Sequence, residues 1–116
     1  MAASFQKTVE QILYKKTKIA FTEFEKQNNL KEKVKLLDKV SNPHPYYKKA
    51  NLFVLTSLYE GFGNVLAEAA MFKVPIISTD CNSGPREILM NGKGGDLIKI
   101  YDYKDLSKKI ISNLNH

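Results

Sequence analysis

The sequence predicts a single α/β domain built on a Rossmann-like parallel sheet with flanking helices. From residue 34 onward, short apolar runs alternate with segments rich in helix-forming residues. This alternation implies parallel strands joined by right-handed crossovers. Residues 52–55 and 74–78 are apolar on neighbouring rather than alternate positions, which is typical of strands covered on both faces. A length of 116 residues leaves room for one domain.

Ahead of this domain, residues 4–28 are expected to form an amphipathic helix, so the chain divides into an N-terminal helix (1–30) and a domain (31–116). Its apolar side would hold Phe5, Val9, Ile12, Leu13, Ala20 and Phe24, and its polar side Lys7, Lys15, Lys18 and Lys26. A solvated lysine face is the favoured interpretation. Docking onto an anionic membrane surface is the alternative.

The remaining elements follow from local signals. Strands are expected at 34–37, 52–55, 74–78 and 96–100, helices at 46–50, 65–73, 84–89 and 103–114, and loops or turns at 41–45, 60–64 and 91–95. Pro75 should stand at the start of its strand because proline has no amide hydrogen for the ladder. Tyr46 and Tyr47 are expected to pack against the domain.

Charge and cysteine content restrict the class of partner and the compartment. The net charge of +6 lies in residues 1–50, which hold 11 Lys against 5 acidic residues. Arg86 is the single arginine, and arginine is the preferred reader of base edges, so nucleic-acid recognition is not favoured. No apolar run could span a membrane or serve as a secretion signal. The lone Cys81, expected to be partly exposed, favours a reducing cytoplasm, with a peripheral position at the inner membrane face as the alternative.

The segment 56–68 carries the chemistry. A buried strand runs through a glycine-rich turn into a helix, whose first free amides, those of Gly63, Asn64, Val65 and Leu66, suit a phosphate. Glu60 and Glu68 bracket the turn. Carboxylates beside a phosphate are repulsive unless they bind something else, and sugar hydroxyls are suitable donors. The pattern therefore indicates a nucleotide sugar. A turn that serves only packing, with Glu68 stabilising the helix, is the alternative.

A resemblance extends this interpretation. The stretches KVKLL, NPHPYYKKANLFVLTSLYEGFGNVLAEAA, VPIISTD, SGPREIL and NGKGGDLI are similar to the C-terminal domain of group 1 (family 4) glycosyltransferases. The resemblance implies a partial GT-B C-terminal domain, the donor-binding half of an enzyme that transfers sugar with retention, without a metal or other cofactor. UDP-linked hexose or N-acetylhexosamine donors are favoured, with a glycan or lipid-linked acceptor.

The resemblance also assigns roles. Glu60 would be the catalytic residue that contacts the donor sugar near its reacting carbon, Glu68 would bind the ribose, and Glu87 would be structural. The donor-binding set it implies is Gly61, Phe62, Gly63, Asn64, Val65 and Glu68.

The departures from the family are large. We find no acceptor-binding N-terminal domain, and residues 1–20 show no strand, glycine turn or basic pair of the kind that opens the family's C-terminal domain. His44, expected in a surface loop, and His116 are unsuitable as the catalytic histidine. We therefore expect a chain that is inactive without a separately encoded acceptor domain. A non-catalytic remnant, or a basic module that binds anionic membrane or nucleic acid, remains the alternative.

Overall fold

The computed structural model describes residue 35 and residues 37–115. The predicted helix at 4–28 and the predicted boundary after residue 30 lie outside the described residues. A compact unit begins at Ser41.

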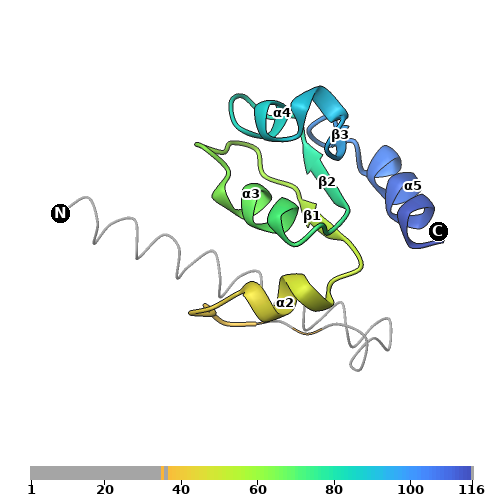
Figure 1. The fold of residues 1–116 in the computed structure, drawn as a ribbon. Helices are drawn as coiled ribbons and strands as arrows, with labels where there is room; N and C mark the ends of the chain where they lie inside the picture. The colour runs from red at the N-terminus through yellow and green to blue at the C-terminus, as the bar shows by residue number, and fades with distance from the viewer. Residues whose placement is uncertain (1–34, 36, 116) are drawn as a thin grey trace. The chain divides into compact units, whose positions relative to one another are not determined.

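Three parallel strands form the centre of this unit (Figure 1). They are β1 (Phe53–Leu55), β2 (Ile76–Thr79) and β3 (Asp96–Ile98), in the spatial order β1-β2-β3. Phe53 pairs with Ile76, and Ile77 pairs with Asp96. Each strand lies within one to two residues of its predicted position. The predicted α/β fold with a Rossmann-like parallel sheet is confirmed.

Helices connect and flank the strands. They are α2 (His44–Lys49), α3 (Asn64–Met71), α4 (Pro85–Ile88) and α5 (Tyr103–Leu114), with a single 3₁₀ turn, η1 (Met90–Gly92), before β3. Helix α5 has the predicted bounds because its start is capped: the Asp102 side chain accepts a hydrogen bond from the Asp105 amide at 3.0 Å.

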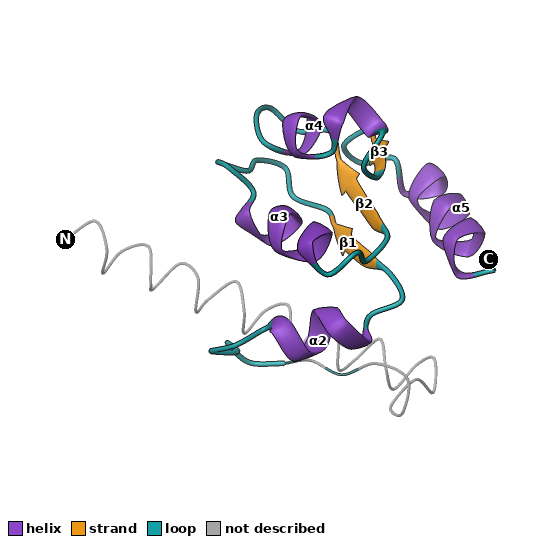
Figure 2. Cartoon of the chain, in the orientation of Figure 1, coloured by secondary structure: helices purple, strands orange, loops and turns teal. Residues whose placement is uncertain are grey.

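The two faces of the sheet are covered by different helices, α3 on one side and α5 on the other (Figure 2). The core on the α3 side contains Tyr47, Leu66, Ala69, Val74, Ile76 and Leu89. On the α5 side, the Asn113 amide donates to Asp96 at 3.1 Å, which ties the helix to β3. All residues of β2 are buried, as expected for a strand covered on both faces.

Strand β1 is an exception to that expectation. Val54 is 36% exposed, although the apolar run predicted burial on both faces. The reason is position: β1 is at the edge of the described sheet, and α5 contacts β2 and β3. The strand predicted at 34–37 is also absent at its described positions, Lys35 and Leu37, which have irregular backbone. A short apolar run forms a strand only where a neighbour pairs with it, and among described residues β1 pairs with β2 alone.

Two local predictions were wrong. Residues 44 and 45 belong to α2 rather than to the predicted loop, because a proline in the first helical turn loses no hydrogen bond. The His44 ring packs on Phe72 with centroids 5.2 Å apart. Cys81 is 3% exposed and therefore buried rather than accessible. None of the helices in the described part is long and apolar enough to cross a membrane.

Candidate functional site

The glycine-rich turn joins the carboxyl end of β1 to the start of α3. Ligands of parallel sheets bind at this end of the strands. Gly63 caps α3 in the left-handed conformation, with φ at 75°, and a Cβ there would meet Ile88 Cδ1 at 3.3 Å. Gly61 is different: a Cβ added to it would have no atom within 4 Å. Gly63 is thus required by the backbone, whereas Gly61 leaves open space beside the turn.

The start of α3 offers amides to an anion. The N–H groups of Gly63, Asn64 and Val65 donate no hydrogen bond within the described residues. The amide of Leu66, predicted to be free, donates to the Gly63 carbonyl at 2.9 Å because the first turn is tight. No side chain caps the helix and its first turn holds no acidic residue. The partial positive charge at this end is therefore unneutralised by the helix itself.

The carboxylate of Glu60 is held immediately before this helix. Ser57 Oγ donates to Glu60 Oε1 at 2.5 Å, and the Glu60 side chain is half-buried. The bond fixes one oxygen and leaves the other able to accept hydrogen bonds from a ligand.

Glu68 lies four residues after the start of α3, on the same side of the helix as Asn64 and about 6 Å further along the axis. Tyr47 OH donates to Glu68 Oε2 at 3.1 Å. Burial raises the pKa of the Tyr47 hydroxyl, and the hydrogen bond to Glu68 and its negative charge raise it further. Tyr47 packs against Phe53 and Phe72, as predicted, and it also orients the second carboxylate. The same prediction was wrong for Tyr46, which is 49% exposed.

The end of β2 and the loop that follows it hold the turn in place. Ser83 Oγ donates to the Glu60 carbonyl at 3.0 Å. Thr79 Oγ1 donates to the Ser57 carbonyl at 2.5 Å. Gly84 has φ at 90° and packs so closely that a Cβ would lie 2.8 Å from the Gly61 carbonyl oxygen. The path of the turn is therefore fixed from outside as well as by its own glycines.

The structure thus brings the predicted residues together around the start of α3. Glu60 precedes the helix, Gly61 and Phe62 form the turn, Gly63, Asn64 and Val65 open the helix, and Glu68 follows. Phe62 is 67% exposed, so its ring does not fill the turn. Ser57, Ser83 and Gly84 were not predicted as site residues, although hydroxyl and glycine residues in the segments that follow strands are a usable signal.

Glu87 has a different position from the one expected. It is exposed in α4 and forms no hydrogen bond or ion pair within the described residues, so no structural role is seen for it. Its neighbour Arg86 pairs with Asp80 through two guanidinium nitrogens. In residues 35 and 37–115, no three His, Cys, Asp or Glu side chains are grouped so that they could hold a metal ion.

Comparison with known proteins identifies the family of the chain. The "Uncharacterized glycosyltransferase MJ1059" of Methanocaldococcus jannaschii is 49% identical over 61 residues, which is 53% of this chain and 15% of that protein. The N-acetylgalactosamine-N,N'-diacetylbacillosaminyl-diphospho-undecaprenol 4-alpha-N-acetylgalactosaminyltransferase of Campylobacter jejuni is 39% identical over 75 residues, 65% of this chain and 20% of that protein.

The crystal structure of TarM superposes with a TM-score of 0.73 at 29% identity, over 82% of this chain and 19% of that one. The chain therefore spans about a fifth of the length of these relatives. The profile of the family described as "Glycosyl transferases group 1" matches residues 16–116. The chain belongs to the group 1 glycosyltransferase family.

Proposed function

We propose that this chain binds the nucleotide-diphosphate sugar donor of a retaining glycosyltransferase. The observation that carries the proposal is the start of α3, where the amides of Gly63, Asn64 and Val65 donate no hydrogen bond within the described residues and the first turn of the helix holds no acidic residue. Such a helix end binds phosphate. A diphosphate leaving group gains negative charge as the sugar bond breaks, and fixed amides stabilise that charge without reorganising.

The two carboxylates supply specificity for hydroxyl groups. Glu60, with one oxygen held by Ser57, would accept hydrogen bonds from the donor sugar close to its reacting carbon. Glu68, with one oxygen held by Tyr47, would accept them from the ribose. Preorientation reduces the entropy lost on binding. Gly61 and Phe62 would line the sugar-diphosphate, since the space beside Gly61 is open.

The family and the relatives narrow the donor class. The Campylobacter relative is named as an N-acetylgalactosaminyltransferase that acts on a diphospho-undecaprenol-linked acceptor. We infer a UDP-linked hexose or N-acetylhexosamine as donor, and a glycan or lipid-linked sugar as acceptor. No resident cofactor or metal is invoked. The buried, single Cys81 is compatible with a reducing cytoplasm.

The chain spans about a fifth or less of its relatives, and we propose that transfer needs, besides the donor site, a part of the enzyme that holds the acceptor opposite it. The sequence leaves two alternatives, a non-catalytic remnant and a basic module that binds anionic membrane or nucleic acid. A remnant would bind donor and never transfer, even with a partner. The basic module rests on residues 4–28, outside the described part.

Titration with UDP and UDP-sugars, followed by calorimetry or by amide chemical shifts, tests the proposal. Amide shifts should be largest at residues 61–65. Glu68→Gln should weaken binding about tenfold, because one charge-assisted hydrogen bond contributes about 1.5 kcal/mol. Glu87→Gln, an exposed carboxylate in α4, is the matched control and should bind as the unmodified chain does. If neither UDP nor GDP perturbs the protein at millimolar concentration, the proposal is wrong.

A further inference from the structure

The turn that carries Glu60 is anchored by hydrogen bonds to the neighbouring strand and loop. Its side chains at Leu58, Tyr59 and Phe62 are exposed and do not belong to the hydrophobic core of the described unit. The bonds that reach the turn from other elements come instead from two hydroxyl groups. One belongs to the last residue of β2 and the other to the loop that follows β2.

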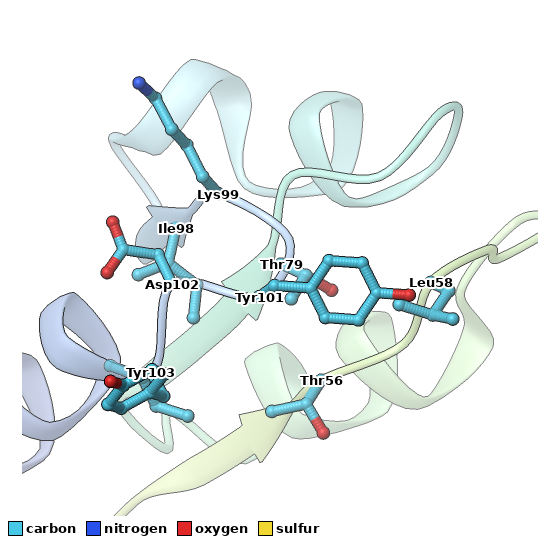
Figure 3. A pocket seen from close by; sticks show the side chains of 9 residues that line it. Thr56, Leu58, Thr79, Ile98, Lys99, Tyr101, Asp102 and Tyr103 are labelled. Atoms are coloured by element: carbon cyan, nitrogen blue, oxygen red, sulfur yellow. The ribbon is translucent and has the colours of Figure 1, made fainter.

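The first anchor is Thr79, at the carboxyl end of β2. It is buried, and its Oγ1 donates to the Ser57 carbonyl at 2.5 Å. Figure 3 shows Thr79 at an apolar hollow of about 190 Å³, which Leu58 and Ile98 also line. A hydrogen bond in apolar surroundings is stronger than the same bond in water. Thr79 thus fixes the residue whose own hydroxyl holds the Glu60 carboxylate.

The second anchor is Ser83, and it is held in a costly backbone conformation. Its Oγ donates to the Glu60 carbonyl at 3.0 Å and lies 3.5 Å from the Gly61 carbonyl oxygen. Ser83 has φ at 64°, in the left-handed region that residues other than glycine rarely adopt. Gly84 follows at φ of 90° and is pressed against the turn. Strain of this kind persists where the surroundings impose it, and it is concentrated at functional sites.

The two hydroxyl groups of Ser57 and Ser83 hold the two ends of one residue. Ser57 holds the carboxylate of Glu60, and Ser83 holds its main-chain carbonyl. The next residue, Gly61, has no side chain and has open space beside it, so it does not restrain the turn. Without Ser83, the Glu60 carboxylate would keep a single bond to a residue three positions earlier, and the turn could move together with it.

We propose that Ser83 is a positioning residue that sets the Glu60 carboxylate for the sugar part of the donor. The inference rests on the proposed function, in which Glu60 accepts hydrogen bonds from the donor sugar and the start of α3 binds the diphosphate. Ser83 acts through Glu60 and does not itself contact the donor. Its loss should therefore weaken binding of a UDP-sugar and leave binding of UDP, which has no sugar, unchanged.

Two substitutions of Ser83 separate positioning from stability. Ser83→Gly removes the hydroxyl but also relieves the strain, because glycine adopts a left-handed conformation freely, so its thermal midpoint should stay close to that of the unmodified chain. Ser83→Ala removes the hydroxyl and keeps the strain, so its midpoint should fall. Both should raise the dissociation constant of the UDP-sugar about fivefold, which is less than the loss of a full hydrogen bond to a charged group.

Calorimetric titration of the full chain with UDP, UDP-glucose and UDP-N-acetylglucosamine measures these constants. The quantity compared between variants is the ratio of the UDP-sugar constant to the UDP constant. In a chain that already carries Glu60→Ala, Ser83→Gly should not change this ratio further, because no carboxylate is left to position. Asn91→Gly is the matched control: Asn91 is exposed, has φ at 56° and lies in η1, so the same relief of strain should leave the ratio unchanged.

A ratio that Ser83→Gly leaves unchanged, in a chain that still binds UDP, overturns the inference and leaves the proposed function standing. Equal weakening of UDP and UDP-sugar also overturns it, since Ser83 would then act on the whole turn. If neither UDP nor a UDP-sugar binds the unmodified chain, the proposed function fails and the inference fails with it. Circular dichroism establishes that each variant is folded, and Ser83→Gly decides alone if Ser83→Ala is not.

Discussion

At the scale of single residues, the site depends on side chains that hold the two carboxylates. Tyr47 and Ser57 each occupy one carboxylate oxygen, of Glu68 and Glu60 respectively. The Ser57 contact is local, because Ser57 precedes Glu60 by three residues, whereas Tyr47 reaches Glu68 from α2, 21 positions away. A carboxylate fixed in this way presents its second oxygen in a defined direction, which is what recognition of a sugar hydroxyl requires.

Replacing Tyr47 by phenylalanine isolates one of these contacts. Tyr47→Phe should lower the free energy of unfolding by about 1 kcal/mol at neutral pH and weaken UDP binding. The pKa of Tyr47 is raised above its ordinary value of 10.0 in the folded state. As pH rises past about 10, the unfolded chain loses this proton first, so the stabilisation present at lower pH is lost.

Urea unfolding of both proteins between neutral pH and pH values above about 10 measures this effect. The stability difference between them should shrink as the pH rises. A difference that stays constant over this range would mean that the Tyr47 hydroxyl does not contribute through its proton.

Substitution by alanine should have opposite effects at two glycines of the site, on stability at one and on UDP affinity at the other. Gly84→Ala should destabilise the chain by about 1–3 kcal/mol, because its Cβ would lie 2.8 Å from the Gly61 carbonyl oxygen and its φ of 90° is left-handed. Gly61→Ala should leave stability nearly unchanged, since nothing lies within 4 Å, yet lower UDP affinity by intruding on the ligand's space. Thermal unfolding and UDP titration of both variants separate the two effects. If Gly61→Ala binds UDP as tightly as the unmodified chain does, the proposed ligand does not lie beside Gly61.

At the scale of elements, the sequence predicted most of the helices and strands but little of how they pack against one another. The bounds of α5 agree with the prediction to the residue, and the Asp102 side chain caps its start. The start of α2 was misplaced, since proline in a first helical turn resembles a loop breaker in the sequence. The exposure of Val54 in β1 depends on which helix covers which strand, and the sequence pattern carries no such information.

The candidate site also has a part that the sequence predicted and a part that it did not. Residues 60–68 are contiguous, so their grouping at a helix start followed from the strand–turn–helix pattern. The Tyr47–Glu68 and Ser83–Glu60 contacts join residues 21 and 23 positions apart. Such contacts depend on the packing of α2 and of the loop after β2 against the turn, which a motif does not specify.

The charge at the start of α3 can be tested independently of its side-chain contacts. Asn64→Asp should stabilise the fold by about 0.3–1 kcal/mol through the helix dipole, and should weaken UDP binding because the new carboxylate repels the diphosphate. Ala70→Asp, exposed near the other end of α3, is the control and should destabilise slightly without affecting UDP. Urea unfolding and calorimetry provide both values; a stabilised Asn64→Asp that binds UDP as before would argue against an anion site at this helix end.

At the scale of the whole molecule, the proposed donor site lies where β1 ends and α3 begins. Ligands of parallel sheets bind at this carboxyl end of the strands. The relatives are about five to seven times as long as the segment that matches. Under the proposed function, donor binding and sugar transfer can therefore be separated: the first would need the residues around α3, and the second would also need an acceptor held opposite them.

The purified chain should bind UDP-sugars and release no UDP above the rate of spontaneous hydrolysis. Transfer requires the acceptor hydroxyl to be held against the reacting carbon, and orientation of two reactants supplies about 7–11 kcal/mol of a catalysed barrier. Under the proposed function, the residues at the start of α3 would stabilise the leaving group and would not supply that orientation. A coupled assay for released UDP, with Glu60→Gln as the comparison, measures this directly. Turnover by the isolated chain that Glu60→Gln abolishes would show that these residues suffice, and that the acceptor is oriented by this chain itself.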